Sequence, residues 1–102
     1  MGRLTRKQLH KKFTQICPNC YFQPPSTIKM AYPCIVYNRS NIESTHANNR
    51  KYQNDTQYTV TVIDRNPDST IPTEILDTFT MSEFNNGFVH DNLHHSVMVL
   101  YT

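Results

Sequence analysis

The sequence predicts a small α+β domain, in which two helices pack on a small, mostly antiparallel sheet. Two segments carry apolar residues at helical spacing, and four segments have the β-branched or aromatic character of strands. The length of 102 residues suits one domain, so residues 1–102 are expected to form a single unit. The expected order along the chain is helix, strand, strand, helix, strand, strand.

The first helix is expected at residues 5–16. Leu9, Phe13 and Ile16 recur at spacings of four and three, which places them in one apolar stripe. Thr5 is the expected N-cap, and the Pro-Asn pair that follows residue 17 ends the helix.

Two strands follow an extended, proline-containing connection, the first at Cys34–Asn38 and the second at Tyr58–Asp64. Between them, residues 39–57 are expected to form a long polar hairpin loop. Ile42 and Tyr52 are the large apolar side chains in that loop. Ordinary connections are much shorter, so a loop of this kind is either functional or disordered in the free chain.

The second half of the chain should add a helix and two strands. The helix has Pro72 in its first turn. Its apolar face consists of Ile71, Ile75, Leu76 and Phe79. A strand at 81–84 and a turn at 85–87 should follow. The final strand, 96–101, is apolar on both faces and is therefore expected inside the sheet.

The charge is unevenly distributed along the chain. The net charge is +2, but five of the ten Lys and Arg residues lie in the first twelve positions. They are Arg3, Arg6, Lys7, Lys11 and Lys12. A nucleic-acid contact is one interpretation of this basic segment. A solvated helix face is the favoured interpretation, because the pI of about 8.5 is low for a nucleic-acid-binding domain.

Several functional classes have little support in the sequence. No apolar run is long enough to cross a membrane, and no apolar segment follows the basic N-terminus as in a signal peptide. The chain is therefore expected to remain in the compartment where it is made. No nucleophile elbow or phosphate-binding loop is visible, and two glycines are few for such a loop. We expect no catalytic residue and no cofactor.

Two groups of residues invite a metal interpretation. Cys17, Cys20 and Cys34 would need a fourth ligand to hold a structural zinc ion, and neither His10 nor His46 has a recognisable spacing. Small buried thiols are the favoured interpretation. His90 and His94 have a helical i, i+4 spacing, but exposed polar strand residues explain them equally well. We therefore expect no metal site.

The chain resembles the small neck proteins of tailed bacteriophages. The stretches that carry the resemblance are Tyr32–Tyr37, Tyr58–Ser69, Phe88–Leu93 and Val97–Tyr101, with the polar loop after the first of them. The resemblance implies a tail terminator, also called a tail completion or tail-to-head joining protein. It implies an α+β subunit in a ring, expected to be hexameric, that caps the tail tube, stops its polymerisation and joins the tail to the head.

The resemblance also implies partners. They are further copies of the chain, the tail tube protein and a head-closure or connector protein, with DNA passing through the lumen without specific binding and no membrane involved. The expected location is the neck of the virion, with the host cytoplasm during assembly. The 39–57 loop is the expected assembly segment. Within it, the expected contacts are Ile42, His46, Arg50 and Tyr52, and Tyr52 is the expected anchor because it is an aromatic residue in a polar loop.

Three alternatives stay open from the sequence. A head-closure or adaptor subunit that contacts the portal has the same kind of pattern. A small DNA-binding module would use the basic N-terminal helix, although that helix has no evident helix-turn-helix partner. A metal-dependent domain would use the cysteines.

Overall fold

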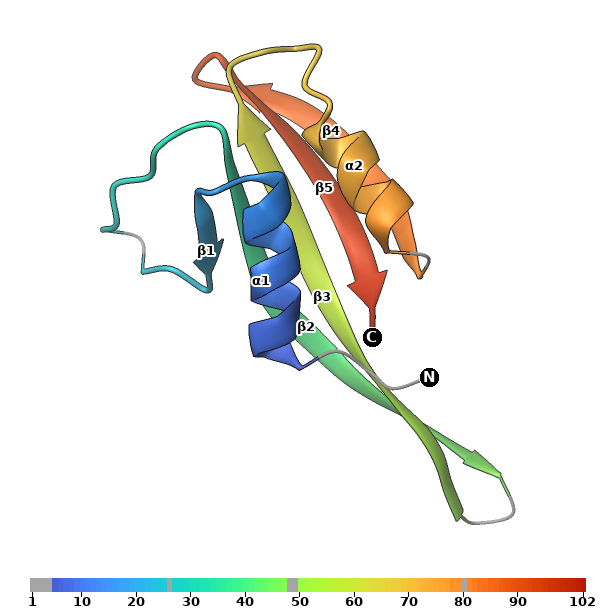
Figure 1. The fold of residues 1–102 in the computed structure, drawn as a ribbon. Coiled ribbons are helices and arrows are strands. Elements are labelled where there is room, and N and C mark those ends of the chain that lie inside the picture. The colour runs from blue at the N-terminus through green and yellow to red at the C-terminus, as the bar shows by residue number, and fades with distance from the viewer. Residues whose placement is uncertain (1–4, 26, 48–49, 80) are drawn as a thin grey trace.

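A five-stranded sheet with two helices on one face forms the domain (Figure 1). The computed structural model describes residues 5–25, 27–47, 50–79 and 81–102, with 41–47 and 50–55 described by their backbone. The elements are α1 (Arg6–Ile16), β1 (Cys20–Phe22), β2 (Cys34–Ala47), β3 (Arg50–Asp64), α2 (Ile71–Thr78), β4 (Ser82–His90) and β5 (Leu93–Tyr101). The strand order is β1-β2-β3-β5-β4, and β1 pairs with β2 in parallel while the other pairs are antiparallel. The predicted α+β class is confirmed.

The helix α1 begins and packs as its sequence predicts. The Thr5 hydroxyl accepts a hydrogen bond from the Gln8 amide at 3.2 Å, and the Gln8 side chain accepts one from the Thr5 amide at 2.9 Å. This reciprocal capping box satisfies two amides that the first helical turn leaves without a partner. Leu9 and Phe13 are fully buried against the sheet.

Aromatic rings join the two helices to the sheet. The Phe13 ring lies 4.9 Å from the ring of Tyr37 on β2 and 5.4 Å from the ring of Phe79, which follows α2. Tyr37 in turn contacts the rings of Phe22 and Tyr58 on the neighbouring strands. The remaining fully or nearly buried members of this cluster are Leu9, Cys17, Ile35, Val60, Val62, Ile75, Met98 and Leu100.

The second helix and the last strand also lie where the sequence places them. Ile75 and Phe79 are buried, and Ile71 and Leu76 pack against the core from partly buried positions. Strand β5 lies between β3 and β4, which agrees with the prediction that the final strand is internal.

The turn in the second half was predicted at the wrong position. Residues 85–87 lie within β4, where the change of register between Phe84 and Asn86 marks a bulge. The chain instead turns at Asp91 and Asn92, whose φ angles are 52° and 60°. Asp and Asn tolerate this left-handed conformation better than most residues do, so they fit a tight hairpin. Strands β4 and β5 are consequently longer than expected.

The 39–57 segment also differs from the prediction. It was expected as a loop, but β2 continues to Ala47 and β3 begins at Arg50, so most of the segment is paired strand. The physical reason is that segments rich in Thr, Asn and Gln can form strand pairs through their backbones even when neither face of the strands is apolar. Hydrophobic alternation, by which buried strands are predicted, is absent from such a pair.

Truncation of Phe13 should destabilise the domain strongly. Phe13→Ala removes the ring that touches both β2 and the end of α2, and a buried Phe→Ala change costs about 3–5 kcal/mol of unfolding free energy. Urea denaturation measures the loss. Lys11→Ala, an exposed change on the same helix, is the control and should stay within about 0.5 kcal/mol of the wild type. A similar small effect for both variants would contradict this description of the core.

Candidate assembly surfaces

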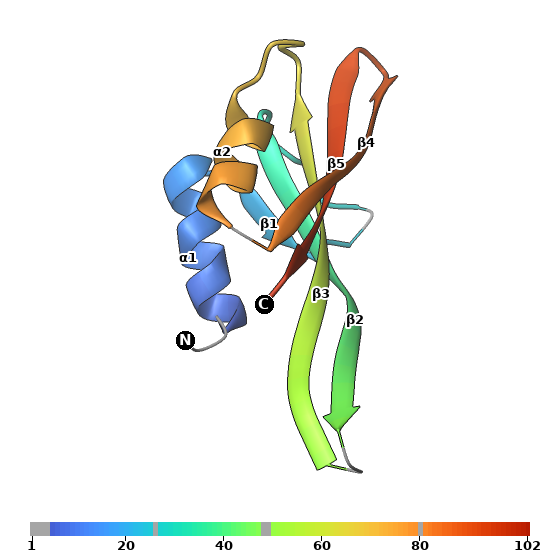
Figure 2. The same cartoon turned by 90° about the vertical axis from the view of Figure 1, so that its right-hand side faces the viewer.

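The distal parts of β2 and β3 form a two-stranded arm that extends away from the rest of the sheet. On one side of this pair, β5 ends with Tyr101 opposite Gln57, and on the other, β1 ends with Phe22 opposite Tyr37. We call residues 41–47 and 50–56 the arm. Its strands pair with each other, as Ile42 with Thr56 and Ala47 with Arg50, and Figures 1 and 2 show that it projects well past both helices. It makes the molecule long, with extents of 50 × 26 × 23 Å.

An isolated two-stranded ribbon of this kind is marginally stable in water. Beyond Thr56, whose amide and carbonyl bond to Thr102, it lacks a third strand and a helix to pack on, and both of its edges carry backbone groups that no further strand in the described chain pairs. A segment of this type gains stability when another chain covers or extends it.

All four predicted assembly contacts lie on the arm. Ile42 and His46 belong to β2, and Arg50 and Tyr52 belong to β3. His46 pairs with Lys51 next to a change of register, and Tyr52 lies in that irregular stretch. The side chains of these four residues lie outside the described part of the structure, so their role as contacts stays a prediction.

The second candidate surface is the edge strand β4, which sequence reasoning missed. Among the described residues, five large apolar side chains are exposed, and four of them lie on β4 or directly before it. They are Met81, Phe84, Phe88 and Val89, with exposed fractions of 61%, 52%, 48% and 60%. Three of these apolar residues fall in the segment 84–89, and they were the available sequence signal for this surface. They were not interpreted in this way because part of the segment was predicted as a turn.

Pairing with β5 places these apolar residues on both faces of β4. Phe84 pairs with the buried Met98, so it lies on the face that carries the helices. Phe88 pairs with His95, and their rings stack at 4.6 Å with an 8° tilt. One long edge of β4 has no strand beside it in the described sheet. Exposed apolar side chains along an unpaired strand are typical of an interaction site.

The basic helix presents its charges away from the core. Lys7, Lys11 and Lys12 are exposed on α1, whereas Arg6 packs its guanidinium 4.8 Å from the centre of the Phe22 ring. Arg3 lies outside the described residues. This arrangement agrees with the interpretation of a solvated helix face that covers the core with its other side.

The three cysteines have the character of unreactive thiols, with Cys17 and Cys34 buried and Cys20 partly buried. Burial raises the pKa of Cys20 from 9.0 to about 12 and that of Cys34 to about 11, with smaller contributions from the neighbouring thiols. The pKa of Cys17 is also raised, again mainly by burial. Nucleophilic attack requires the thiolate, which these environments disfavour.

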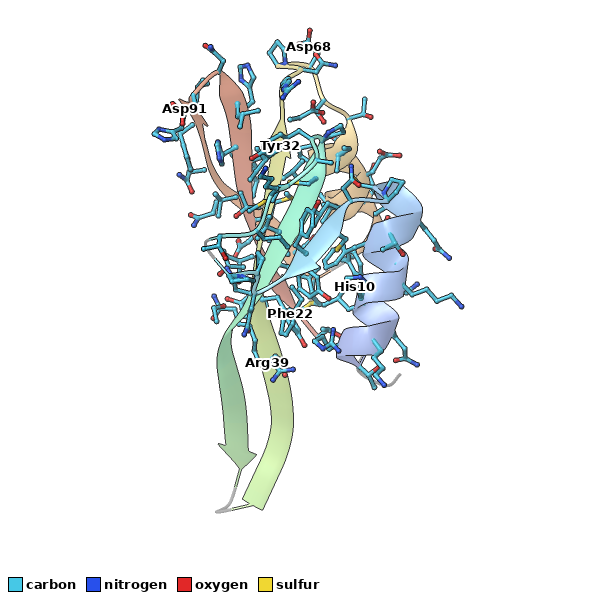
Figure 3. The ribbon with its side chains drawn as sticks, turned by 90° about the vertical axis from the view of Figure 1, so that its left-hand side faces the viewer. His10, Phe22, Tyr32, Arg39, Asp68 and Asp91 are labelled. Carbon is cyan, nitrogen blue, oxygen red and sulfur yellow. The ribbon has the colours of Figure 1, made fainter. Side chains whose placement is uncertain are left out.

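A polar cluster lies between α1 and the sheet, beside the cysteines. His10 Nδ1 lies 2.7 Å from the Tyr37 hydroxyl, and the Cys20 sulfur lies 3.9 Å from the same nitrogen (Figure 3 labels His10). The contact with His10 gives the buried Tyr37 phenol a hydrogen-bond partner. Within residues 5–25, 27–40, 56–79 and 81–102, no group of three or more His, Cys, Asp or Glu side chains is arranged to hold a metal ion.

The histidines near the last hairpin do not share one strand. The turn at Asp91 and Asn92 separates His90 from His94, and His94 pairs with Val89 instead. His90 Nε2 lies 3.2 Å from Asp91 Oδ2, and both side chains are largely exposed. The i, i+4 spacing therefore reflects a hairpin and not a helical face.

Comparison with protein-family models and with curated protein sequences gives no match. No helix in the described ranges is long and apolar enough to cross a membrane.

The buried thiols predict a loss of stability at alkaline pH. The pKa of Cys20 is higher in the folded chain than its ordinary value of 9.0, so its contribution is complete below pH 9 and is lost as the pH rises towards about 12. The difference in unfolding free energy between the wild type and Cys20→Ala should shrink over this range. A difference that stays constant from pH 8 to pH 11 would contradict a raised pKa for Cys20.

Proposed function

We propose that this chain is a structural subunit that assembles with copies of itself into a ring. The observation that supports the proposal is the arm, a two-stranded ribbon that leaves the core and carries unpaired backbone on its edges. A second chain that pairs with or covers the arm would supply the stability that the arm lacks alone. The edge strand β4 offers a further surface, so the subunit has two different surfaces, as a closed heterologous ring requires.

The composition of the arm fits a segment that orders on assembly. Residues 41–56 include five Asn or Gln residues and have Ile42 and Tyr52 as their large apolar side chains. Low hydrophobicity keeps such a segment soluble in the free subunit and limits premature association. The few apolar side chains then act as anchors once a partner excludes water from them.

Within this class, we propose the role of a tail terminator in the neck of a tailed bacteriophage. The resemblance of residues 32–37 and 58–69 to small neck proteins supports this form. A ring at the end of the tail tube would cap the tube, stop its growth and join it to a head connector. A near-neutral net charge of +2 suits a ring that lets DNA slide through its lumen, because strong phosphate binding needs many basic contacts. The proposed location is the virion neck, with assembly in the host cytoplasm.

Replacing the proposed anchor should impair assembly more than folding. Tyr52→Ala removes the aromatic side chain of the arm and leaves the core cluster around Phe13 unchanged. We expect a clear loss of ring formation or tube capping with a melting temperature close to that of the wild type. Tyr32→Ala, which removes a tyrosine from the loop before β2, is the matched control and should leave assembly unchanged. Normal assembly of Tyr52→Ala, or a melting loss that accounts for its defect, would count against this role.

Co-purification tests the proposed role directly, because it identifies the phage particle to which the chain binds. A tail terminator should form rings by native mass measurement and should co-purify with tail tubes. Co-purification with DNA-filled heads in place of tubes would instead identify a head-closure or adaptor subunit. Salt-sensitive, high-affinity DNA binding by a monomer would favour the DNA-binding module and would contradict the proposed ring.

A further inference from the structure

The charges of this chain are separated along its sequence. All ten Lys and Arg residues lie between positions 3 and 65, and residues 66–102 contain none. The same C-terminal stretch contains five of the eight acidic residues: Asp68, Glu74, Asp77, Glu83 and Asp91. Such a distribution has a structural consequence only if the fold keeps the two halves apart.

The fold places the two halves at opposite edges of the sheet. The strand order β1-β2-β3-β5-β4 puts the first strand at one edge and β4 at the other, and α1 contacts β1 while α2 contacts β4 (Figure 1). We call Arg6, Lys7, Lys11 and Arg39 the basic edge, and Glu74, Asp77 and Glu83 the acidic edge. All seven side chains are exposed except that of Arg6, which is partly buried.

The basic edge is built around β1. The guanidinium groups of Arg6 and Arg39 lie 4.8 Å and 6.0 Å from the centre of the Phe22 ring, which holds both cations beside this strand (Figure 3). Lys7 and Lys11 lie one turn apart on the side of α1 opposite to Leu9 and Phe13, so their ammonium groups face solvent.

The acidic edge combines charge with apolar surface and free backbone. Asp77 lies on the side of α2 opposite to the buried Ile75, and Glu83 lies next to Phe84 along β4, on the face of the sheet without helices. Phe84 and Val89 lie on the helix-bearing face of β4, and more than half of each side chain is exposed. A surface with an apolar centre and a charged rim has the anatomy of a protein interface.

We propose that the acidic edge of one copy docks on the basic edge of the next copy, and that this contact closes the ring. The proposal rests on the ring function proposed above and names its subunit contact. Both helices lie on the same face of the sheet, so a head-to-tail arrangement brings α2 of one copy beside α1 of the next. Lys side chains at this boundary can lay their aliphatic parts on Phe84 and reach the carboxylates of α2 with their ammonium groups.

Charge also argues against the simplest competing contact. A two-fold dimer formed by pairing β4 with β4 would cover the same apolar residues. It would also bring Glu83 and the α2 carboxylates of one copy towards those of the other, and the acidic half has no Lys or Arg to neutralise them. Like charges that face each other disfavour such a dimer, whereas the head-to-tail contact joins opposite charges.

Charge reversal provides the test. We expect Asp77→Lys with Glu83→Lys, and separately Lys7→Glu with Lys11→Glu, to weaken self-association by roughly tenfold or more, because the first pair turns the attraction into a repulsion and the second cancels the positive charge of the basic edge. Sedimentation and native mass measurement give the oligomer distribution. The control Asp68→Lys changes charge by the same amount per residue in the loop before α2, at the end of the molecule opposite to the arm (Figure 3) and outside the acidic edge, and should leave self-association unchanged.

Mixing the two reversed variants makes the test specific to a head-to-tail contact. One variant carries basic groups on both edges, and the other carries carboxylates at two positions of α1 in place of ammonium groups, so neither should assemble alone. An equal mixture brings the introduced basic groups of one variant against the introduced carboxylates of the other, and should restore rings in which the two alternate. A chain that carries all four reversals should also assemble. Rings that survive either reversal, or mixtures that stay monomeric, would overturn this contact while leaving the ring function intact. A wild-type chain that forms no oligomer, with or without tail tubes, would overturn both.

Discussion

The contact between Phe13 and its two aromatic neighbours is the interaction on which the rest of the fold depends. Phe13 comes from the first helix, Tyr37 from the sheet and Phe79 from the end of the second helix, so three elements that are distant in sequence meet at one ring. Burial of such rings stabilises a small domain by both apolar area and ring geometry. With two short helices of 11 and 8 residues, the chain has few other side chains that bridge its layers.

Because that core is small, it cannot cover every strand. The helices pack over the middle of the sheet, so the ends of β2 and β3 run beyond them and the β4 edge keeps exposed apolar side chains. Both uncovered regions are costly for an isolated molecule, since one is a marginal ribbon and the other exposes rings to water. In the proposed assembly, a neighbouring chain completes the domain. The uncovered arm and the exposed β4 edge are both consequences of that one constraint.

Much of the fold was predictable from local patterns. The stripe of Leu9 and Phe13, the Thr5 cap and the apolar final strand identified their elements because each rests on short-range periodicity or capping chemistry. The turn at Asp91 was missed because Asn85–Gly87 is a stronger turn signal in isolation, whereas pairing with β5 makes it a bulge. The short strand β1 was assigned to an extended connection, because its parallel pairing with β2 has no local signal.

The candidate surfaces were predictable to different degrees. The 39–57 segment was predicted from its polar character to be either functional or disordered in the free chain, but its strand structure was not predicted, because a ribbon without an apolar face has no hydrophobic alternation. The β4 edge was missed because exposure is a tertiary property, and Phe84 and Phe88 look like core residues in sequence. The separation of charge was visible in the sequence, but its meaning required the strand order.

Amide hydrogen exchange of the arm, measured in the free subunit and in the assembled ring, tests the central claim most directly. The claim is that the arm is completed by another chain. The account predicts that amides of residues 41–56 exchange much faster than those of the core strands in the free subunit, and become protected on assembly. Arm amides that are as protected in the monomer as those of Val60 and Met98, or that remain unprotected in the ring, would contradict it.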